Sequence, residues 1–264
     1  MELKKTEYVV ENHIAIITMN CMKNLNAIDE QMADELLYLF QQAEKDDEVK
    51  VVVLNGTQKA FSAGGDIGFF YEQVQAGGAI SLDGLIARVG NVADTMKKMS
   101  KLIITAVSGA AAGAGVSLAL GGDFLVCADN AKFILAFVNL GLVPDTGAVY
   151  LLSKSIGAAR TMELSATGRP MGAAEAKELG LAYQVVPKEE LSDAVMKLAN
   201  KLAAGPLVAY KNMKKQVYEA SFSDYKKWLD QVEAPTQHEC ALTADFTEGV
   251  KAFMEKRKPV FIGK

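Results

Sequence analysis

The spacing of hydrophobic and polar positions changes along this chain, and each spacing predicts a different element. The segment YVVENHIAIITMN, residues 8–20, holds two β-rich runs that meet at residues 11–12, which predicts a β-hairpin. After Asn26, a residue type favoured at helix N-caps, apolar residues recur every three or four positions as far as Ala43. This stripe predicts an amphipathic helix from Asn26 to about Asp46.

Four later runs of β-branched residues end in turn residues and predict buried strands. They are VKVVVLNG (49–56), LIITAVSG (102–109), FLVCAD (124–129) and AYQVVP (182–187). Helical or glycine-rich segments separate them, an alternation typical of an α/β fold with a largely parallel sheet, here in repeated β-β-α units. Because little after about Ser192 predicts strand, we expect a core over residues 1–195 and a helical region over residues 196–264.

Composition and charge narrow the class of protein. The 264 residues are 50% hydrophobic and carry a net charge of −4, which indicates a sizeable core and no general attraction to nucleic acid or to an anionic membrane. Three widely spaced cysteines without the spacing of metal ligands indicate reduced thiols in a cytoplasmic protein, and no apolar segment at the N-terminus directs export. The uncharged run 102–122 is rich in Gly, Ala and Ser, which predicts a strand, a turn and a helix rather than a membrane span.

Two glycine-rich turns form the first candidate site. KAFSAGGDIGFF (59–70) and SGAAAGAGVSLALGGD (108–123) each place small residues after a strand and before a helix. Small residues let a ligand approach the backbone, and the first turn of a helix offers free N–H groups at the positive end of its dipole. The pair can form an oxyanion hole, although glycines that only permit close packing remain the alternative. Neither turn fits a dinucleotide fingerprint or a phosphate loop.

The turn GLVPDTGA, residues 141–148, contains one acid, Asp145. It follows the apolar run AKFILAFVNL, and a carboxylate in apolar surroundings is a candidate general base. Asp145 also fits a structural role, because P-D-T-G is a turn signature and Asp often caps a helix such as the one predicted to follow. The residues alone leave both interpretations open.

Five motifs follow one another along nearly the whole chain: KAFSAGGDI, AVSGAAAGAGVSLALGGDFLVCADNAKF, NLGLVPDTGA, TGRPMGAAEAKELGLAYQVV and EKRKPVF. As a set they strongly resemble the enoyl-CoA hydratase/isomerase, or crotonase, superfamily. The resemblance implies a spiral core of β-β-α units and a C-terminal helical region that assembles homotrimers or dimers of trimers. It also implies acyl-CoA thioester substrates, in which coenzyme A is part of the substrate, and neither a metal nor a dissociable redox cofactor.

The resemblance also implies roles for individual residues. The backbone N–H groups of Gly65 and Ala114 correspond to the pair that holds the thioester oxygen. The residues that correspond to the walls of the coenzyme A channel are Ala63, Asp66 and Ile67 on one side and Asn26 and Ala27 on the other.

Two positions depart from the hydratases of this superfamily, which use two glutamates to hold and activate water. Ser117 and Phe137 stand there, and neither side chain can act as the required acid or base, so the sequence disfavours water addition. Asp145 instead corresponds to the single acid of some enoyl-CoA isomerases. We therefore predict a Δ3,Δ2-enoyl-CoA isomerase or a related enzyme, in which Asp145 carries a proton from C2 to C4 while the two amides hold the enolate oxygen. Phe137, Val138 and Leu142 would raise the pKa of Asp145 if they enclose it.

Other functions stay open. Aryl-CoA dehalogenases of the superfamily also use this aspartate position, but with a tryptophan where Phe137 stands and a histidine at a position that neither His13 nor His238 occupies. The order Ser117, Asp145, His238 is that of an α/β-hydrolase triad, although the surrounding sequence lacks the nucleophile elbow. A non-catalytic acyl-CoA-binding protein would keep the oxyanion hole alone. RNA binding would need the basic segment KNMKK, residues 211–215, which a solvated helix face explains better.

Two neighbouring features bear on the acyl group. The aromatic cluster Phe69, Phe70 and Tyr71 is a candidate wall of the acyl pocket, or simply part of the core. The segment after it, residues 72–84, is expected to be a mobile loop that admits substrate.

Overall fold

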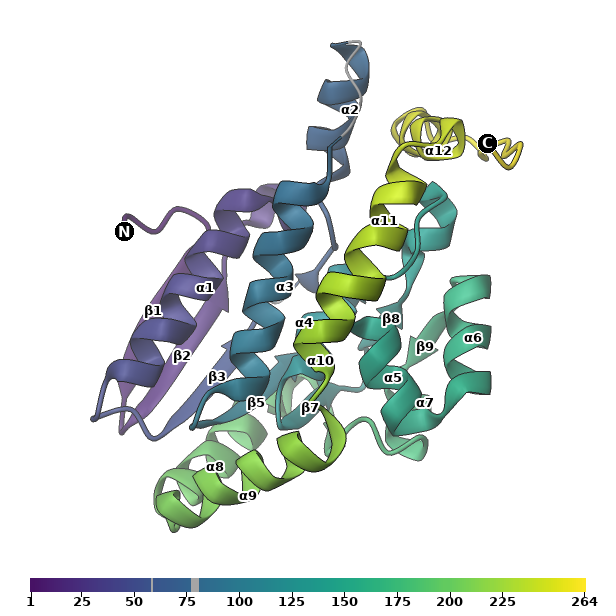
Figure 1. Ribbon diagram of the computed structural model, residues 1–264. Coiled ribbons are helices and arrows are strands. Elements are labelled where there is room, and N and C mark those ends of the chain that lie inside the picture. Colours follow the sequence, from purple (N-terminus) through teal and green to yellow (C-terminus); the bar gives the residue numbers. More distant parts are fainter. Residues whose placement is uncertain (58, 77–80) are drawn as a thin grey trace.

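A mostly parallel β-sheet forms the centre of the computed structural model, which describes residues 1–57, 59–76 and 81–264 (Figure 1). The strand order is β1-β2-β3-β5-β7-β10; the β1–β2 pair is antiparallel and the other pairs are parallel. The strands are β1 (Thr6–Glu11), β2 (Ile14–Met19), β3 (Val51–Asn55), β5 (Leu102–Val107), β7 (Phe124–Ala128) and β10 (Gln184–Val186). Asn12 and His13 form the hairpin turn with positive φ angles, as a tight two-residue turn requires. The predicted hairpin and the four predicted strands are confirmed.

A second, four-stranded sheet has the order β4-β6-β8-β9. Its strands are β4 (Ala60–Ser62), β6 (Ala110–Ala112), β8 (Lys132–Ile134) and β9 (Pro170–Gly172). The strands β4, β6 and β8 follow directly on β3, β5 and β7, and a helix follows each of them. This repetition confirms the predicted β-β-α units, whereas strands of three residues are too short to show a period of their own.

Helices cover both faces of the larger sheet. On one face α1 (Glu30–Lys45) lies beside α3 (Asp83–Lys98) (Figure 1). On the other face α8 (Leu191–Ala203) packs its apolar residues against alternate residues of β3, β5 and β7. The domain boundary expected between residues 195 and 196 falls within α8.

The start of α1 differs from the prediction. Asp29 is the N-cap, and its side chain accepts a hydrogen bond from Met32 N at 2.9 Å. Asn26 is not a cap, because it lies in a left-handed turn (φ +58) three residues earlier, and its side chain is fully buried. The amphipathic stripe was identified correctly, but the polar residue nearest the stripe, rather than the first one, caps the helix.

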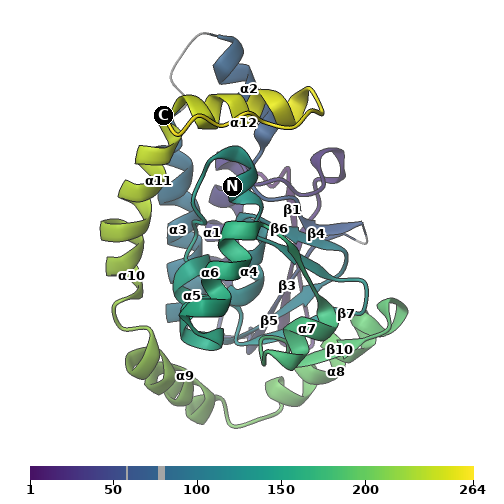
Figure 2. The same ribbon diagram turned by 90° about the vertical axis from the view of Figure 1, so that its right-hand side faces the viewer.

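The remaining helices divide between the core and the C-terminal region. In the core they are α2 (Ile67–Gln75), α4 (Ala114–Gly121), the 3₁₀ helix η2 (Ala136–Leu140), α5 (Ala148–Ile156), α6 (Ala158–Thr167) and α7 (Ala173–Glu178). The C-terminal region holds α9 (Leu207–Ser221), α10 (Tyr225–Trp228), the π-helical turn η4 (Leu229–Glu233), α11 (Ala234–Ala241) and α12 (Ala244–Met254). Figure 2 shows these last helices running along one side of the core until α12 lies across α2.

The uncharged run 102–122 forms β5, β6 and α4, as predicted. Of the helices in the described part of the chain, none has both the length and the apolar character needed to cross a membrane.

Candidate active site

The two glycine turns lie against each other because the strands before them are paired. β4 pairs with β6 in parallel, so the turns that follow the two strands leave the sheet at the same edge. A Cβ atom on Gly64, which has φ +87, would lie 2.8 Å from Ala112 O, and one on Gly113, which has φ +50, would lie 3.6 Å from Gly64 Cα. Glycine is therefore required at Gly64 both for backbone conformation and for the close approach of the two turns.

Each turn leaves one backbone amide that has no hydrogen-bond partner among the residues the structure describes. Gly113 is the N-cap of α4, and no side chain caps this helix, so Ala114 N lies at an open helix N-terminus. In the other turn, Ile28 N donates to Gly64 O and Asp66 N donates to Ile28 O, which leaves Gly65 N outside the bridge. Within the described residues, neither Gly65 N nor Ala114 N donates a hydrogen bond.

The turns border a small apolar cavity of about 70 Å³. Its wall includes Gly65 and Gly113 from the turns and the rings of Phe70 and Phe137. The carboxyl-bearing residue on this wall is Asp145. A base and an apolar surface therefore share one cavity with the glycine turns.

Asp145 is held by hydrogen bonds to both carboxylate oxygens. Thr146 Oγ1 donates to Oδ1 at 2.9 Å, and Gln237 Nε2 donates to Oδ2 at 3.0 Å. Burial raises the pKa of Asp145 to about 6, and the two hydrogen bonds oppose this rise. The backbone is fixed as well, because the buried Ser117 donates from Oγ to Asp145 O at 2.8 Å.

The helix-cap interpretation of Asp145 is wrong. The N-cap of α5 is Gly147, and no side chain caps this helix. The side chain of Asp145 turns instead to Thr146 and to the C-terminal helix. The backbone carbonyl of Asp145 also stabilises the turn, by accepting from Ala148 N at 3.1 Å.

Two polar residues of the C-terminal region join this site and were not identified from the sequence. Gln237 contacts the carboxylate directly, and Glu233 accepts from Gly147 N at 2.8 Å. Burial raises the pKa of Glu233 to about 8, and the nearby Asp145 charge adds to the rise. The available signal was their spacing of four residues in a helix, which places two polar side chains on one face.

The predicted neighbours of Asp145 are only partly correct. Phe137 and Leu142 line the cavity, as expected. Val138 does not; it lies against Gly168 instead, because the 3₁₀ turn of η2 directs successive side chains apart. Of the aromatic cluster, Phe70 lines the cavity whereas Phe69 is 41% exposed.

The residues predicted to contact coenzyme A lie around the first glycine turn. Ala63 and Ile67 line the cavity. The Asp66 carboxylate caps α2 by accepting from Phe69 N, and it also accepts from Asn24 Nδ2 at 2.9 Å. The side chain of Asn26 bonds within the protein, donating to Ala60 O and Phe61 O.

The predicted walls of the channel meet at this turn. Ala27 is buried beside Ile28, which bridges to Gly65.

The hydrolase triad is not assembled. Ser117 Oγ bonds to the backbone of Asp145 rather than to a histidine. His238 is exposed and pairs with Asp83, at 2.8 Å between Nδ1 and Oδ1. The expected substrate-admitting loop, residues 72–84, is partly wrong, because residues 72–75 belong to α2 and residues 83–84 to α3; residues 77–80 lie outside the described residues.

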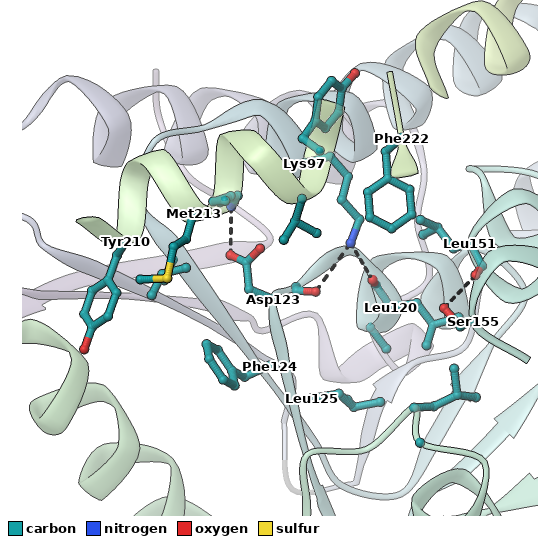
Figure 3. Close-up of a pocket in the computed structure, with 18 of the residues that line it drawn as sticks. Lys97, Leu120, Asp123, Phe124, Leu125, Leu151, Ser155, Tyr210, Met213 and Phe222 are labelled. Atoms are coloured by element: carbon teal, nitrogen blue, oxygen red, sulfur yellow. Dashed lines mark hydrogen bonds and ion pairs between the residues drawn. The ribbon is translucent and has the colours of Figure 1, made fainter. Parts of the chain in front are cut away.

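A much larger cavity, of about 480 Å³, lies between α4, β7 and α9 (Figure 3). Three charged residues there form what we call the lysine cluster: Lys97, Asp123 and Lys214. Lys214 Nζ lies 2.8 Å from Asp123 Oδ2, and Lys97 Nζ donates to Leu120 O at 3.1 Å. The basic segment 211–215 is therefore not a uniform surface patch, because one of its lysines is buried in an ion pair.

The described residues contain no group of three or more His, Cys, Asp or Glu side chains placed to hold a metal ion. The polar groups on the cavity wall, among the described residues, are backbone amides, the side-chain amide of Gln237 and the carboxyl of Asp145. They suit proton transfer and the binding of a developing negative charge on oxygen.

Comparisons with known proteins extend over the whole chain. A profile of the family described as Enoyl-CoA hydratase/isomerase matches residues 10–264. The chain is 35% identical over 264 residues, the full length of both, to the trans-2-decenoyl-[acyl-carrier-protein] isomerase of Streptococcus mutans. It is 37% identical over 256 residues, 97% of each chain, to the 1,2-epoxyphenylacetyl-CoA isomerase of Escherichia coli.

A solved structure gives the same result for the fold. The crystal structure of an enoyl-CoA hydratase from Mycobacterium avium subsp. paratuberculosis matches with a TM-score of 0.90 at 29% identity, over 99% of this chain and 100% of that one. The motifs, the paired β-β-α units and these similarities agree, and the chain belongs to the enoyl-CoA hydratase/isomerase family.

Proposed function

We propose that the protein is an isomerase of unsaturated acyl thioesters, which moves a carbon–carbon double bond between C3 and C2. One observation carries the proposal: Asp145, whose pKa is raised, lines a cavity bounded by two turns whose Gly65 and Ala114 amides donate no hydrogen bond within the described residues. A shift of this double bond needs one base and one site for the enolate oxygen.

The reaction follows from these groups. The ionised Asp145 takes a proton from C2 of the 3-enoyl thioester, and the electrons delocalise onto the thioester oxygen. The N–H groups of Gly65 and Ala114 stabilise this oxyanion; in enzymes of known mechanism each such donor contributes about 3 to 4 kcal/mol to the transition state. Asp145 then returns the proton at C4, which leaves the conjugated 2-enoyl thioester. Because the pKa of Asp145 is about 6, the carboxylate is mostly ionised at neutral pH and still basic enough to act.

Hydration is the second candidate, because some relatives are hydratases. The probable enoyl-CoA hydratase of Rhodobacter capsulatus is 32% identical over 265 residues. Ser117 and Phe137, the residues at the two hydratase acid positions, speak against it. The Ser117 hydroxyl donates a hydrogen bond to the backbone carbonyl of Asp145, and Phe137 places an apolar ring in the cavity wall. Neither can activate a water molecule.

The cavity wall and the names of similar proteins bear on the acyl group and on its carrier. The cavity wall is mainly apolar, which suits a hydrocarbon chain or ring. One similar isomerase is named for an acyl-carrier-protein thioester and another for a coenzyme A thioester. We propose coenzyme A as the carrier, with Ala63, Asp66 and Ile67 along it, because a chain with a net charge of −4 has no overall attraction for an acidic carrier protein.

The test is incubation with a 3-enoyl-CoA and, separately, with crotonyl-CoA, followed by mass spectrometry in ordinary and in deuterated water. We expect conversion of the 3-enoyl thioester to the conjugated isomer without change of mass in ordinary water. Efficient addition of one water molecule to crotonyl-CoA, without isomerisation, would refute the proposal in favour of hydration. Assays of the same acyl group on both carriers separate coenzyme A from the carrier protein.

A further inference from the structure

A C-terminal segment contacts the Asp145 loop through two buried polar side chains. Glu233 ends the π-helical turn η4, and Gln237 lies one turn later in α11. Residues four apart lie on the same face of a helix, so the two side chains approach the loop together. Glu233 is 4% exposed and Gln237 is 0% exposed.

The side-chain amide of Gln237 is fixed at both ends. Its Oε1 accepts from Val143 N at 3.1 Å, and its Nε2 donates to Asp145 Oδ2 at 3.0 Å. A backbone N–H can only donate and a carboxylate can only accept, so rotating the amide by half a turn would break both bonds. The donor end therefore faces the carboxylate.

Glu233 holds the loop on the other side of Asp145. Its Oε2 accepts from Gly147 N at 2.8 Å. Thr146 lies between Asp145 and Gly147, and its φ of +58 is rare for a β-branched residue. Bonds at residues 143 and 147 thus hold a strained turn in place on both sides of Asp145.

We propose that Gln237 is the positioning residue of Asp145: its amide fixes the orientation of the carboxylate in the cavity and favours its ionised form. The inference rests on the proposed function, because it assigns a partner to the base of that reaction. Gln237 does not touch the reacting atoms and acts through Asp145.

Hydrogen bonds, rather than ion pairs, stabilise the Asp145 carboxylate. Within the described residues, neither Asp145 nor Glu233 forms a salt bridge. From α10 the buried Tyr225 hydroxyl donates to Thr146 O at 3.2 Å, and from α11 the His238 ring is turned outward, where its Nδ1 lies 2.8 Å from Asp83 Oδ1 of α3. Among the described residues, the groups that stabilise the carboxylate are therefore the neutral donors Thr146 and Gln237.

Two substitutions with opposite signatures test this role through the pH dependence of kcat/KM. Gln237→Met removes the donor at similar volume. We expect a fall of about 10- to 100-fold at pH 7 and a shift of the acid limb to higher pH, because a hydrogen bond to the ionised carboxylate is lost. Gln237→Glu keeps an acceptor for Val143 N but can donate to Asp145 only while the new carboxyl is protonated. Its profile should gain a basic limb that the wild type lacks.

The matched control is Gln231→Glu, the same substitution at an exposed position of η4, which should keep the wild-type profile. An infrared titration of protein with carboxyl-labelled aspartate, compared with Asp145→Asn, follows the ionisation of Asp145 without catalysis. We expect its midpoint to rise in Gln237→Met. An unmoved acid limb and infrared midpoint in Gln237→Met, with no basic limb in Gln237→Glu, would overturn the inference even if activity fell, because a purely structural role changes activity without changing the ionisation.

The two proposals fail separately. If Asp145→Asn isomerises as fast as the wild type, the proposed function is wrong, whatever the infrared midpoint does. If Asp145→Asn is inactive but the Gln237 variants leave the ionisation of Asp145 unchanged, only the role of Gln237 is wrong.

Discussion

Two buried polar clusters in this molecule balance their charges in different ways. In the lysine cluster, Lys214 pairs with Asp123 and also donates to two backbone carbonyls, and Lys97 donates to the C-terminal end of α4 (Figure 3). In what we call the carboxyl cluster, Asp145, Glu233 and Gln237, two acids lie near each other, and neither pairs with a cation among the described residues. Both clusters join the core to the C-terminal helices.

This difference in charge pairing indicates that the lysine cluster serves stability and the carboxyl cluster serves catalysis. Breaking a buried ion pair by removing one partner is costly, because it leaves an uncompensated charge in the interior. Buried acids without a cation keep raised pKa values, which is what a base working near neutral pH requires. Cavity size does not indicate the chemistry here, because the lysine cluster borders about 480 Å³ and the carboxyl side chain of Asp145 only about 70 Å³.

The largest effect on catalysis is expected from Asp145→Asn. It keeps the size of the side chain but removes the base, so isomerisation should fall by about 10²- to 10⁴-fold, as for the loss of a general base. Binding of a coenzyme A thioester, measured by calorimetry, should survive because the glycine turns are unchanged. Retained turnover in this variant would mean that the carboxyl cluster, like the lysine cluster, is structural.

The largest effect on stability is expected from Lys214→Met. It leaves the Asp123 carboxylate without its ion-pair partner, so the free energy of unfolding should fall by about 3 kcal/mol, measured by urea denaturation. The pH profile of activity should stay in place. Lys215→Met, at the exposed neighbouring position, is the control and should change stability little. A shift of the pH profile in Lys214→Met would contradict the division between the two clusters.

Glu233→Gln should alter how stability depends on pH. The pKa of Glu233 rises from an ordinary 4.5 to about 8 on folding, so its contribution is fully present below pH 4.5 and is lost as pH rises through 8. Between pH 6 and pH 8, above the pKa of Asp145, the wild type should lose about 2 kcal/mol of stability that the variant keeps. Urea denaturation at both pH values measures this difference; parallel losses in the two proteins would show that Glu233 is not buried as a neutral acid.

The smallest effect is expected from Phe137→Ala. Removal of the ring admits water to the cavity and weakens the desolvation of Asp145, so the acid limb of kcat/KM should move to lower pH by less than about one unit. Val138→Ala, in the neighbouring residue that faces away from the cavity, should leave the limb unchanged. Equal profiles for both variants and the wild type would indicate that Phe137 does not control the pKa of Asp145.

Much of the fold followed from local patterns in the sequence. The hairpin at residues 11–12 and the buried strands carry their period and turn residues within a few positions, so they could be predicted one at a time. The second sheet could not, because its strands are three residues long and are defined by their partners. The cap of α1 was misplaced for a similar reason: Asn26 has the right chemistry, but its side chain is used to bind Ala60 O and Phe61 O.

Some residues of the candidate site could likewise be predicted from the sequence, and others could not. The glycine turns and Asp145 were visible because small residues and an isolated acid are unusual in apolar surroundings. Gln237 was not visible, since a glutamine in a polar helical segment has no distinctive pattern. Its position 92 residues after Asp145 gives it a role only when the C-terminal helices fold back on the core.

The sequence by itself determined the longer strands and the amphipathic helix after the hairpin, the two glycine turns and which acid is available, because these depend on period and residue type. The tertiary structure alone decided which charges are paired and which are not. Desolvation and pairing are properties of several packed segments: Asp123 meets Lys214 across 91 residues, whereas Asp145 meets an amide and a second acid instead of a lysine. That choice of partner distinguishes a structural charge from a candidate base.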